Sequence, residues 1–357
     1  MSLSIGIVGL PNVGKSTIFN ALTRQKVDSS NYPFCTIEPN VGCVKVPDDR
    51  LDKLAKLSNS AKIIYSTIEF IDIAGLVRGA HKGEGLGNKF LANIRDCDAI
   101  CHILRHFKKG EIIHVEGKID PKSDLETVNL ELIMADLEQI SKRLDSRKDK
   151  ELTDFKPLLH KIKQNLEKDI LVKDQRLTDE EKILIKQFNF LTAKPCLYVI
   201  NVSEQDLLKT PQDILNESGL DLDQTRVILV CGKMEEELNE LNEVEAKDYL
   251  KNLNIEKTGL EKMIVAGYQL LDLISMLTTG QDETRAWTIR RGTRAPQAAG
   301  KIHTDFEKGF VRVEVIYWTD LLKLGGWPQA KVKGLVHMEG KEYEIKDGDV
   351  VIFHFSK

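Results

Sequence analysis

The 357-residue sequence predicts an α/β fold, in which a parallel sheet is interrupted by an inserted helical hairpin and followed by a small β-rich domain. Three observations predict it. Strand and helix signals alternate over residues 1–125, as in a sheet with crossover helices. Two helical segments then follow, and strand signals resume near residue 195. The region after residue 278 is rich in glycine, β-branched and aromatic residues.

The predicted strands of the first region are short apolar runs. They cover residues 5–8, 41–46, 68–73 and 99–104, and two further runs at 195–200 and 227–231 lie beyond the helical segments. Runs of this length are typical of buried strands in a parallel sheet. We therefore expect one sheet, which the chain leaves and later rejoins.

Two segments with helical periodicity separate these groups of strands. Apolar residues recur at steps of three and four over residues 130–144 and again over 152–166. A polar stretch at 145–150 lies between them, which favours an antiparallel helical hairpin. Two amphipathic helices lying flat on the main domain are the alternative. The sequence Thr-Asp-Glu-Glu at 178–181 is typical of the start of another helix.

The last region has the pattern of a small β-rich domain. Strand signals lie at 287–289, 309–318 and 349–355, where β-branched and aromatic residues alternate with polar ones.

The composition narrows the class of protein. The formal net charge is −4, which argues against a protein that coats nucleic acid or a membrane through bulk positive charge. No apolar run approaches the roughly 20 residues that span a bilayer, and no secretory signal is visible at the N-terminus. The six cysteines form no C-x-x-C pair. These features predict a cytoplasmic protein with no membrane partner.

The most specific motif is a phosphate-binding loop. Residues 9–17 read Gly-Leu-Pro-Asn-Val-Gly-Lys-Ser-Thr after a predicted strand, which is G-x-x-x-x-G-K-[ST] at the correct spacing. The backbone N–H groups of such a loop surround phosphate oxygens. Lys15 can reach the β- and γ-phosphates, and the Ser16 hydroxyl can bind Mg²⁺. A strand–helix turn that carries Lys-Ser by chance is disfavoured by the spacing and by the apolar helix signal that follows.

Further residues are candidates for holding cations at the phosphates. Asp72 begins an Asp-Ile-Ala-Gly segment directly after the apolar strand residues 68–71, where an Asp binds Mg²⁺ through water and Gly75 contacts the γ-phosphate. Thr36 is a candidate for a second Mg²⁺ hydroxyl ligand, with an ordinary loop threonine as an equal alternative. Asn12 is a weaker candidate for holding a monovalent cation such as K⁺.

The base-binding segment predicts a preference for ATP, with GTP weaker. Guanine-specific proteins with this phosphate loop have N-K-x-D after a late strand, and its Asp accepts hydrogen bonds from guanine. Here the segment reads Asn201-Val202-Ser203-Glu204, which weakens the guanine contact without excluding adenine. Val202 is expected to pack on the base, and Asn201 to contact either the base or the phosphate loop. The segment Cys231-Gly232-Lys233 is expected to form the last base-contacting loop.

The residue that positions the attacking water is not evident. Leu76 follows Gly75 at the position where Ras-type GTPases have a Gln, and leucine can neither donate nor accept a proton. Slow intrinsic turnover, or hydrolysis completed by a partner, follows as a hypothesis. His81 and His114 are candidate catalytic groups, although a surface or structural role is the more common one for such histidines.

Together these residues give a resemblance that covers essentially the whole chain. It rests on the loop at 9–17, Tyr-Pro-Phe-Cys-Thr-Ile-Glu-Pro-Asn-Val-Gly at 32–42, Asp-Ile-Ala-Gly-Leu at 72–76, Gly-Glu-Gly-Leu-Gly-Asn at 83–88, Asn-Val-Ser-Glu at 201–204, and Ala-Pro-Gln-Ala-Ala-Gly-Lys-Ile-His-Thr-Asp-Phe at 295–306. With this set the chain resembles the YchF-type Obg-like ATPases, a branch of the Obg-related P-loop proteins.

The resemblance implies three domains. A P-loop domain of the OBG type is expected in two parts, at 1–128 and 191–277. The helical hairpin is expected at 129–190 and a C-terminal TGS domain of β-grasp type at 278–357.

The resemblance also implies site residues and partners. It implies ATP hydrolysis favoured over GTP, Mg²⁺ bound by Ser16 and Thr36, and Val202 at the adenine. It makes His114 a stronger catalytic candidate beside Lys15. The residues expected to wrap the phosphates are Asn12, Val13, Gly14, Lys15, Ser16 and Thr17. Association with the ribosome or its 50S subunit, in translation or stress responses, is also implied. The alternative is a regulatory switch that uses GTP and has negligible intrinsic hydrolysis.

A basic cluster lies at the start of the β-rich region. Residues 285–301 contain five basic residues and no acidic one, with Trp287 among them: Arg285, Arg290, Arg291, Arg294 and Lys301. Arginines can bridge RNA phosphates and an aromatic ring can stack on a base, so we expect a contact with RNA through this domain. A solvated face with a buried tryptophan is the alternative.

Overall fold

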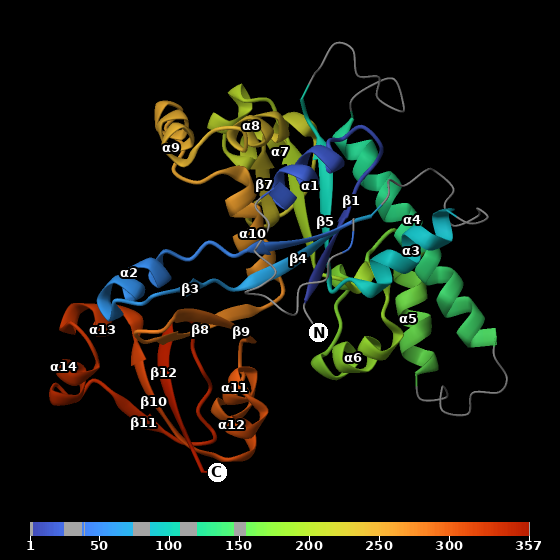
Figure 1. The fold of residues 1–357 in the computed structure, drawn as a ribbon. Helices are drawn as coiled ribbons and strands as arrows, with labels where there is room; N and C mark the ends of the chain where they lie inside the picture. The colour runs from blue at the N-terminus through green and yellow to red at the C-terminus, as the bar shows by residue number, and fades with distance from the viewer. Residues whose placement is uncertain are drawn as a thin grey trace. The chain divides into compact units, whose positions relative to one another are not determined.

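A computed structural model describes residues 3–24, 38, 40–73, 86–107, 120–145 and 155–356 of the chain. The chain divides into two compact units (Figure 1). The first, called here the N-terminal unit, comprises residues 1–24, 36–42 and 69–263. The second, the C-terminal unit, comprises residues 25–35, 43–68 and 264–357.

The predicted parallel sheet is confirmed, and it lies in the N-terminal unit except for residues 43–45 and 67–68, which belong to the C-terminal unit. Its strands are β1 (Ser4–Val8), β2 (Val41–Lys45), β4 (Thr67–Asp72), β5 (Ala99–Arg105), β6 (Cys196–Asn201) and β7 (Val227–Val230), in the order β2-β4-β1-β5-β6-β7. Strand β1 pairs in parallel with β4 and β5, and β6 pairs in parallel with β5 and β7. The carboxyl ends of these parallel strands therefore share one edge, where the loops that follow them meet.

Helices and short 3₁₀ turns (η) lie between these strands or follow the last of them, β7. The helices are α1 (Lys15–Arg24), α3 (Leu86–Asp96), α4 (Pro121–Asp145), α5 (Lys156–Leu166), α6 (Asp179–Ile185), α7 (Pro211–Ser218), α8 (Gly232–Leu238), α9 (Glu243–Asn252) and α10 (Gly259–Leu270). The 3₁₀ turns are η3 (Val172–Asp174), η4 (Lys186–Phe188), η5 (Leu191–Ala193), η6 (Gln205–Leu208) and η7 (Gln224–Arg226). No helix of the described ranges is long and apolar enough to cross a membrane.

The two helices expected from the periodicity are α4 and α5, and they pack against each other. Ile133 and Ile140 of α4 share a buried cluster with Leu159 and Ile162 of α5. Helix α4 also contacts strand β5, so it rests on the sheet as well as on its partner helix. Asp136 of α4 also joins this helix to η5. Its buried carboxylate accepts hydrogen bonds from the backbone N–H groups of Leu191 and Thr192, at 2.9 and 2.8 Å.

A second sheet, also of six strands, forms the C-terminal unit. Its strands are β3 (Ile63–Ile64), β8 (Leu273–Thr279), β9 (Thr284–Arg290), β10 (Phe310–Tyr317), β11 (His337–Glu339) and β12 (Asp349–Phe355), in the order β11-β10-β12-β8-β9-β3. Its helices are α2 (Asp49–Ser58), α11 (Ala295–Ile302), α12 (Thr304–Lys308), α13 (Trp318–Leu324) and α14 (Trp327–Val332). The predicted small β-rich domain is thus confirmed.

Residues 43–68 belong to this C-terminal unit, which the sequence analysis did not anticipate. Leu51 and Leu54 of α2 are fully buried in one cluster with Leu277 of β8 and Val350 of β12. Strand β3 also pairs in parallel with β9. The apolar face of α2 packs on a sheet whose other strands come more than 200 residues later in the chain. The pairing of Ile63 in β3 with Thr284 in β9 spans the same distance along the chain.

Candidate nucleotide-binding site

The loop at residues 9–17 joins β1 to α1 at the carboxyl edge of the first sheet. Asn12 has φ of 64° and Gly14 has φ of 98°, a left-handed conformation that favours glycine. A Cβ atom on Gly14 would lie 2.1 Å from Nδ2 of Asn201, so no larger residue fits there without displacing that side chain. The loop is therefore held tightly against the end of β6.

Lys15 is buried at the start of α1. Its Nζ donates a hydrogen bond to the carbonyl oxygen of Leu10 at 2.8 Å. Burial lowers the pKa of Lys15 to about 8, and the nearby carboxylate of Asp72 partly opposes that shift. Such a lysine is expected to gain a stronger partner when phosphate oxygens enter the loop.

Asn201 connects the phosphate loop to the base-binding segments. Its Nδ2 donates to the carbonyl of Val13 at 3.0 Å, and its Oδ1 accepts from the N–H of Gly232 at 3.1 Å. The side chain is 4% exposed, so both ends of its amide are used inside the protein. Of the two roles considered for Asn201, the structure supports the contact with the phosphate loop.

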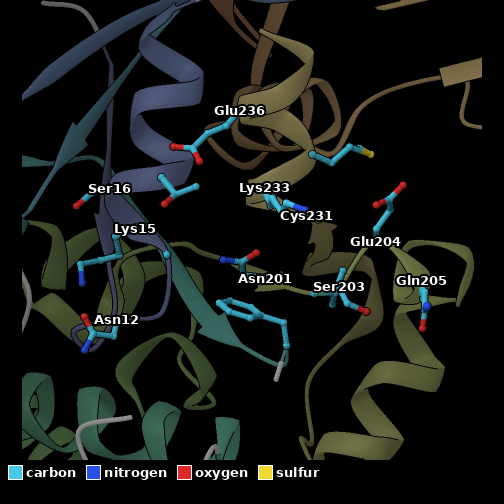
Figure 2. Close-up of a pocket in the computed structure, with 15 residues that line it drawn as sticks. Asn12, Lys15, Ser16, Asn201, Ser203, Glu204, Gln205, Cys231, Lys233 and Glu236 are labelled. Carbon is cyan, nitrogen blue, oxygen red and sulfur yellow. The ribbon is translucent and has the colours of Figure 1, made fainter. Parts of the chain in front are cut away.

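A cavity of about 770 Å³ lies beside these residues (Figure 2). Its volume is in the range of pockets that hold small ligands such as a mononucleotide. The lining residues are Asn12, Gly14, Lys15, Ser16, Thr17, Phe107, Asn201, Val202, Ser203, Glu204, Gln205, Cys231, Lys233, Met234 and Glu236. Figure 2 shows Asn12, Lys15 and Ser16 on one side of Asn201, and Ser203, Glu204 and Gln205 on the other. Val13 and Gly232 do not line the cavity, and they contribute backbone contacts to Asn201 instead.

The predicted base-binding residues lie at the second end of the cavity. Val202 is 2% exposed, and its N–H donates to the carbonyl of Val230 at 2.9 Å. The exposed carboxylate of Glu204 accepts a hydrogen bond from the hydroxyl of Tyr249 at 3.1 Å. Cys231 is buried, and burial raises the pKa of its thiol, so it presents a neutral, weakly polar wall. This end of the cavity therefore combines the apolar Val202 and the neutral Cys231 with the polar side chains of Ser203, Glu204 and Gln205.

Several residues of the site were not predicted from the sequence: the lining residues Phe107, Gln205, Met234 and Glu236, and Arg105, which contacts Phe107. Phe107 lines the cavity, and the guanidinium of Arg105 lies over its ring at 4.5 Å. Arg105 is fully buried, and it donates to the carbonyl oxygens of Asn12 at 3.3 Å and Phe107 at 3.2 Å. An arginine directly after the strand predicted at 99–104 was the available signal, because a buried charge needs several acceptors.

Ser16 and Asp72 provide oxygen ligands that fit Mg²⁺. The Ser16 residue is exposed at the cavity wall. Atom Oδ1 of Asp72 is buried and has no hydrogen-bond partner among the described residues. Burial raises the pKa of Asp72, and the ammonium of Lys15 opposes that shift. A buried carboxylate oxygen without a donor is suited to a cation or its bound water, since hard divalent cations prefer oxygen ligands.

Several predicted residues lie outside the described ranges: Thr36, Gly75, Leu76, His81 and His114. Their roles stay predictions. Asn12 is exposed and lines the cavity, and binding of K⁺ there also stays a prediction.

Comparison with known proteins places the chain among its relatives. A family model described as "50S ribosome-binding GTPase" matches residues 4–172, and the YchF-GTPase_C model, described as "Protein of unknown function (DUF933)", matches residues 273–356. The chain is 49% identical to the ribosome-binding ATPase YchF of Bacillus subtilis, with 100% of both chains covered. The proteins of the same name from Haemophilus influenzae and Escherichia coli O157:H7 are 48% and 44% identical, again with full coverage. The chain belongs to the YchF family.

A solved structure of the same family has the same fold. The YchF GTPase of Schizosaccharomyces pombe matches with a TM-score of 0.85 and 38% identity, covering 99% of this chain and 98% of that one. A GTP-binding protein of Pyrococcus horikoshii OT3 matches with a TM-score of 0.60 and 20% identity, which is a likeness of fold alone. The predicted P-loop α/β fold and the predicted YchF resemblance are therefore confirmed.

Proposed function

We propose that this chain is a Mg²⁺-dependent ATPase that binds the large ribosomal subunit in the cytoplasm and couples its nucleotide state to translation. The observation that carries the proposal is the junction at Asn201, whose amide joins the phosphate loop to the base-binding segments around one cavity. A P-loop in this arrangement binds a nucleoside triphosphate. The relatives are named ribosome-binding ATPases, and these names support the ribosome as the partner and ATP as the nucleotide.

The walls of the cavity support adenine as the preferred base. Val202 occupies the place of the lysine in N-K-x-D, and Glu204 that of the aspartate. One oxygen of the Glu204 carboxylate, Oε1, already accepts the Tyr249 hydroxyl, so this hydrogen bond competes with one from guanine. Phe107 and Met234 line the cavity and can pack on either purine, so they do not restore the guanine specificity that the aspartate of N-K-x-D provides.

Each phosphate-site residue has a defined task in this proposal. Lys15 binds the β- and γ-phosphates, and the N–H groups of residues 12–17 hold the same oxygens in place. Ser16 and Asp72 hold the Mg²⁺, together with Thr36 in the triphosphate state. When bound, the Mg²⁺ would neutralise negative charge on the β- and γ-phosphates as the γ-phosphoryl group is transferred to water.

Water activation is assigned to residues outside the described ranges. We infer that Leu76 leaves the attacking water without a side-chain partner from that position and that His114 assists instead. The expected consequence is slow turnover that a bound ribosome can accelerate.

Two measurements test the proposed function. The dissociation constants of ADP and GDP should differ in favour of ADP, and single-turnover hydrolysis of ATP should require Mg²⁺ and increase with 50S subunits. The variant Lys15→Ala should lose hydrolysis while its circular dichroism is unchanged. Absence of ATP turnover both with and without 50S subunits would overturn the enzymatic proposal.

A GTP-dependent switch is the second candidate. The Schizosaccharomyces pombe relative is called a GTPase, and the family model that matches residues 4–172 is described as a GTPase as well. A marked preference for GDP over ADP, with negligible hydrolysis, would favour it.

A further inference from the structure

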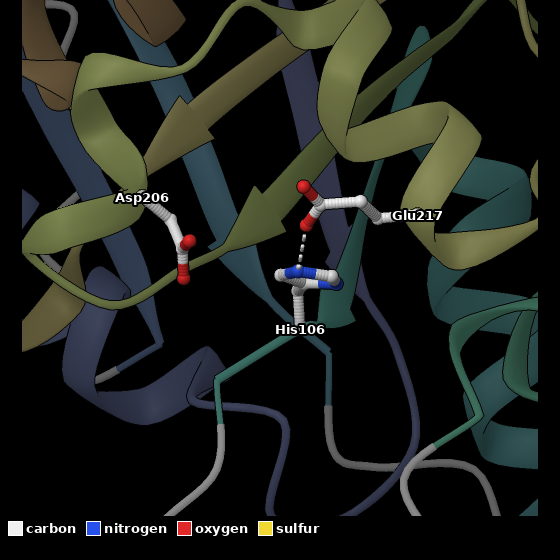
Figure 3. Close-up of side chains that lie close together, drawn as sticks. All are labelled: His106, Asp206 and Glu217. Atoms are coloured by element: carbon white, nitrogen blue, oxygen red, sulfur yellow. Dashed lines mark ion pairs between the residues drawn. The ribbon is translucent and has the colours of Figure 1, made fainter.

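Four ionisable side chains lie close together near the base-binding segment, and Figure 3 shows three of them, His106, Asp206 and Glu217. Atom Nζ of Lys209 lies 2.9 Å from Oδ1 of Asp206 and 2.8 Å from Oε1 of Glu217. Atom Nε2 of His106 lies 3.4 Å from the other carboxylate oxygen of Glu217, and its Nδ1 lies 2.9 Å from the hydroxyl of Ser218. We call His106, Asp206, Lys209 and Glu217 the rear network.

The rear network is joined to two walls of the nucleotide cavity. On one side, the hydroxyl of Ser203, a lining residue, donates to Oδ2 of Asp206 at 2.5 Å. On the other, the N–H groups of His106 and the lining residue Phe107 both donate to the carbonyl of Asn201, at 2.9 and 3.3 Å. Displacement of the network would therefore change the positions of both Ser203 and Phe107.

The network is better described as a set of ion pairs than as a metal site. Ligand atoms of His106, Asp206 and Glu217 lie within 4.8 Å of one another, a spacing at which three such groups can hold a cation. The ammonium of Lys209 already lies between the two carboxylates. The pKa of Asp206 is lowered by its hydrogen bond from Ser203 and by Lys209, and that of Lys209 is raised by Glu217 and Asp206.

We propose that the rear network positions the base-binding segment 201–205 and Phe107, and so sets the affinity of this site for the purine base. The proposal rests on the proposed function only in placing the base in this cavity. The four members of the rear network are positioning residues, because none of them lines the cavity. They act through Ser203, Asn201 and Phe107, which do.

The variant Lys209→Met tests the proposal, because it removes the charge, keeps a chain of similar length and leaves Asp206 and Glu217 to repel each other. The dissociation constant for ADP should rise about 3- to 10-fold, the range expected for a partly exposed charge network. Affinity for Mg²⁺–tripolyphosphate, a probe without a base, should stay within about twofold. In turnover of ATP, KM should rise with kcat unchanged. The variant Lys209→Arg should restore affinity because it keeps the charge.

Lys161→Met is the matched control, since Lys161 forms a comparable ion pair with Glu181 at 2.8 Å in the same unit, between α5 and α6. It should leave ADP affinity unchanged. If Lys209→Met fails to fold, Ser203→Ala provides a second test, since it removes the contact with Asp206 and keeps every charge. It should weaken ADP about 2- to 5-fold and spare tripolyphosphate.

Two results would overturn the proposal: unchanged ADP affinity in both Lys209→Met and Ser203→Ala, or equal weakening of ADP and tripolyphosphate. Failure of the proposed function would look different, because the wild-type protein itself would then not hydrolyse ATP. Should the wild type prefer GDP, the same comparison is made with GDP, and the role of the network is judged on that nucleotide.

Discussion

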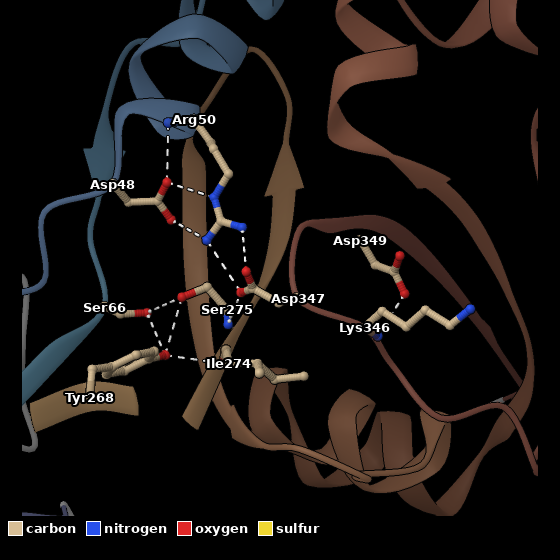
Figure 4. A network of polar contacts seen from close by, with 9 residues as sticks. All are labelled: Asp48, Arg50, Ser66, Tyr268, Ile274, Ser275, Lys346, Asp347 and Asp349. Carbon is tan, nitrogen blue, oxygen red and sulfur yellow. Dashed lines mark hydrogen bonds and ion pairs between the residues drawn. The ribbon is translucent and has the colours of Figure 1, made fainter. Parts of the chain in front are cut away.

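Arg50 and Asp347, which lie 297 positions apart in the chain, are joined side chain to side chain in the C-terminal unit (Figure 4). Atom Nη1 of Arg50 donates to Oδ2 of Asp347 at 2.8 Å, and the same guanidinium pairs with Asp48 at 2.7 Å. The other oxygen of Asp347 accepts the N–H of Ser275 at 2.9 Å. Asp347 therefore ties residues 43–68 to strand β8.

Asp347→Asn is predicted to destabilise the C-terminal unit. The loss should be about 1–2 kcal/mol, because a hydrogen-bonded charge pair is broken while the half-exposed Asp347 side chain limits its value. All three tryptophans, Trp287, Trp318 and Trp327, lie in this unit, so urea unfolding followed by tryptophan fluorescence reports on it directly. Asp320→Asn, which removes an exposed pair with Lys323, should cost under about 0.5 kcal/mol. Equal midpoints for the two variants would contradict the prediction.

Gly14→Ala is predicted to abolish nucleotide binding. Its Cβ would meet Asn201 at 2.1 Å, and alanine disfavours φ of 98°. Calorimetric titration with ADP should show at least a 100-fold loss. The control is Gly219→Ala, where φ is 63° but nothing lies within 4 Å of the new atom. That variant should lose about 1–2 kcal/mol of stability and keep its ADP affinity. Retained binding in Gly14→Ala would show that the phosphates lie elsewhere.

Affinity for ADP is predicted to fall as the pH rises above about 8. Burial lowers the pKa of Lys15 to about 8, and bound phosphate favours its charged form. Above that pH the free protein must take up a proton in order to bind, so log Kd should rise by up to about one unit per pH unit. Fluorescence titrations between pH 7.5 and 9.5 measure this. Lys15→Met should bind weakly with no such slope, and a flat wild-type profile would refute the assignment.

The triple variant Arg290→Gln, Arg291→Gln and Arg294→Gln is predicted to weaken ribosome or RNA binding and flatten its salt dependence. Arg291 and Arg294 form exposed ion pairs with Asp272 and Glu342, at 3.1 and 2.6 Å, and such pairs exchange readily for phosphate. Loss of three phosphate contacts should reduce the slope of log K against log salt by about 2.

Replacing Lys247, Lys251 and Lys257 by Gln in the N-terminal unit makes the same change in charge on another exposed surface. That control should leave the slope unchanged. If both triple variants change the slope equally, the arginine cluster has no specific role.

The sequence alone determined the phosphate loop, the strands of the first sheet and the small β-rich domain. The nine residues from Gly9 to Thr17 act through backbone conformation and local spacing, which a linear motif carries in full. Apolar periodicity likewise reports which face of a strand or helix is buried.

Only the tertiary structure decided which distant residues complete the site. Phe107 lines the cavity, and His106 contacts the backbone of Asn201, because the carboxyl ends of β5 and β6 are adjacent; no spacing along the chain encodes that neighbour relation. Only the tertiary structure likewise shows that the side chain of Asn201 hydrogen-bonds to two loops. The same holds for the place of residues 43–68 in the C-terminal unit. Sequence motifs and apolar periodicity show which residues must be buried or bind a ligand. The pairing of strands determines which distant residues lie beside them.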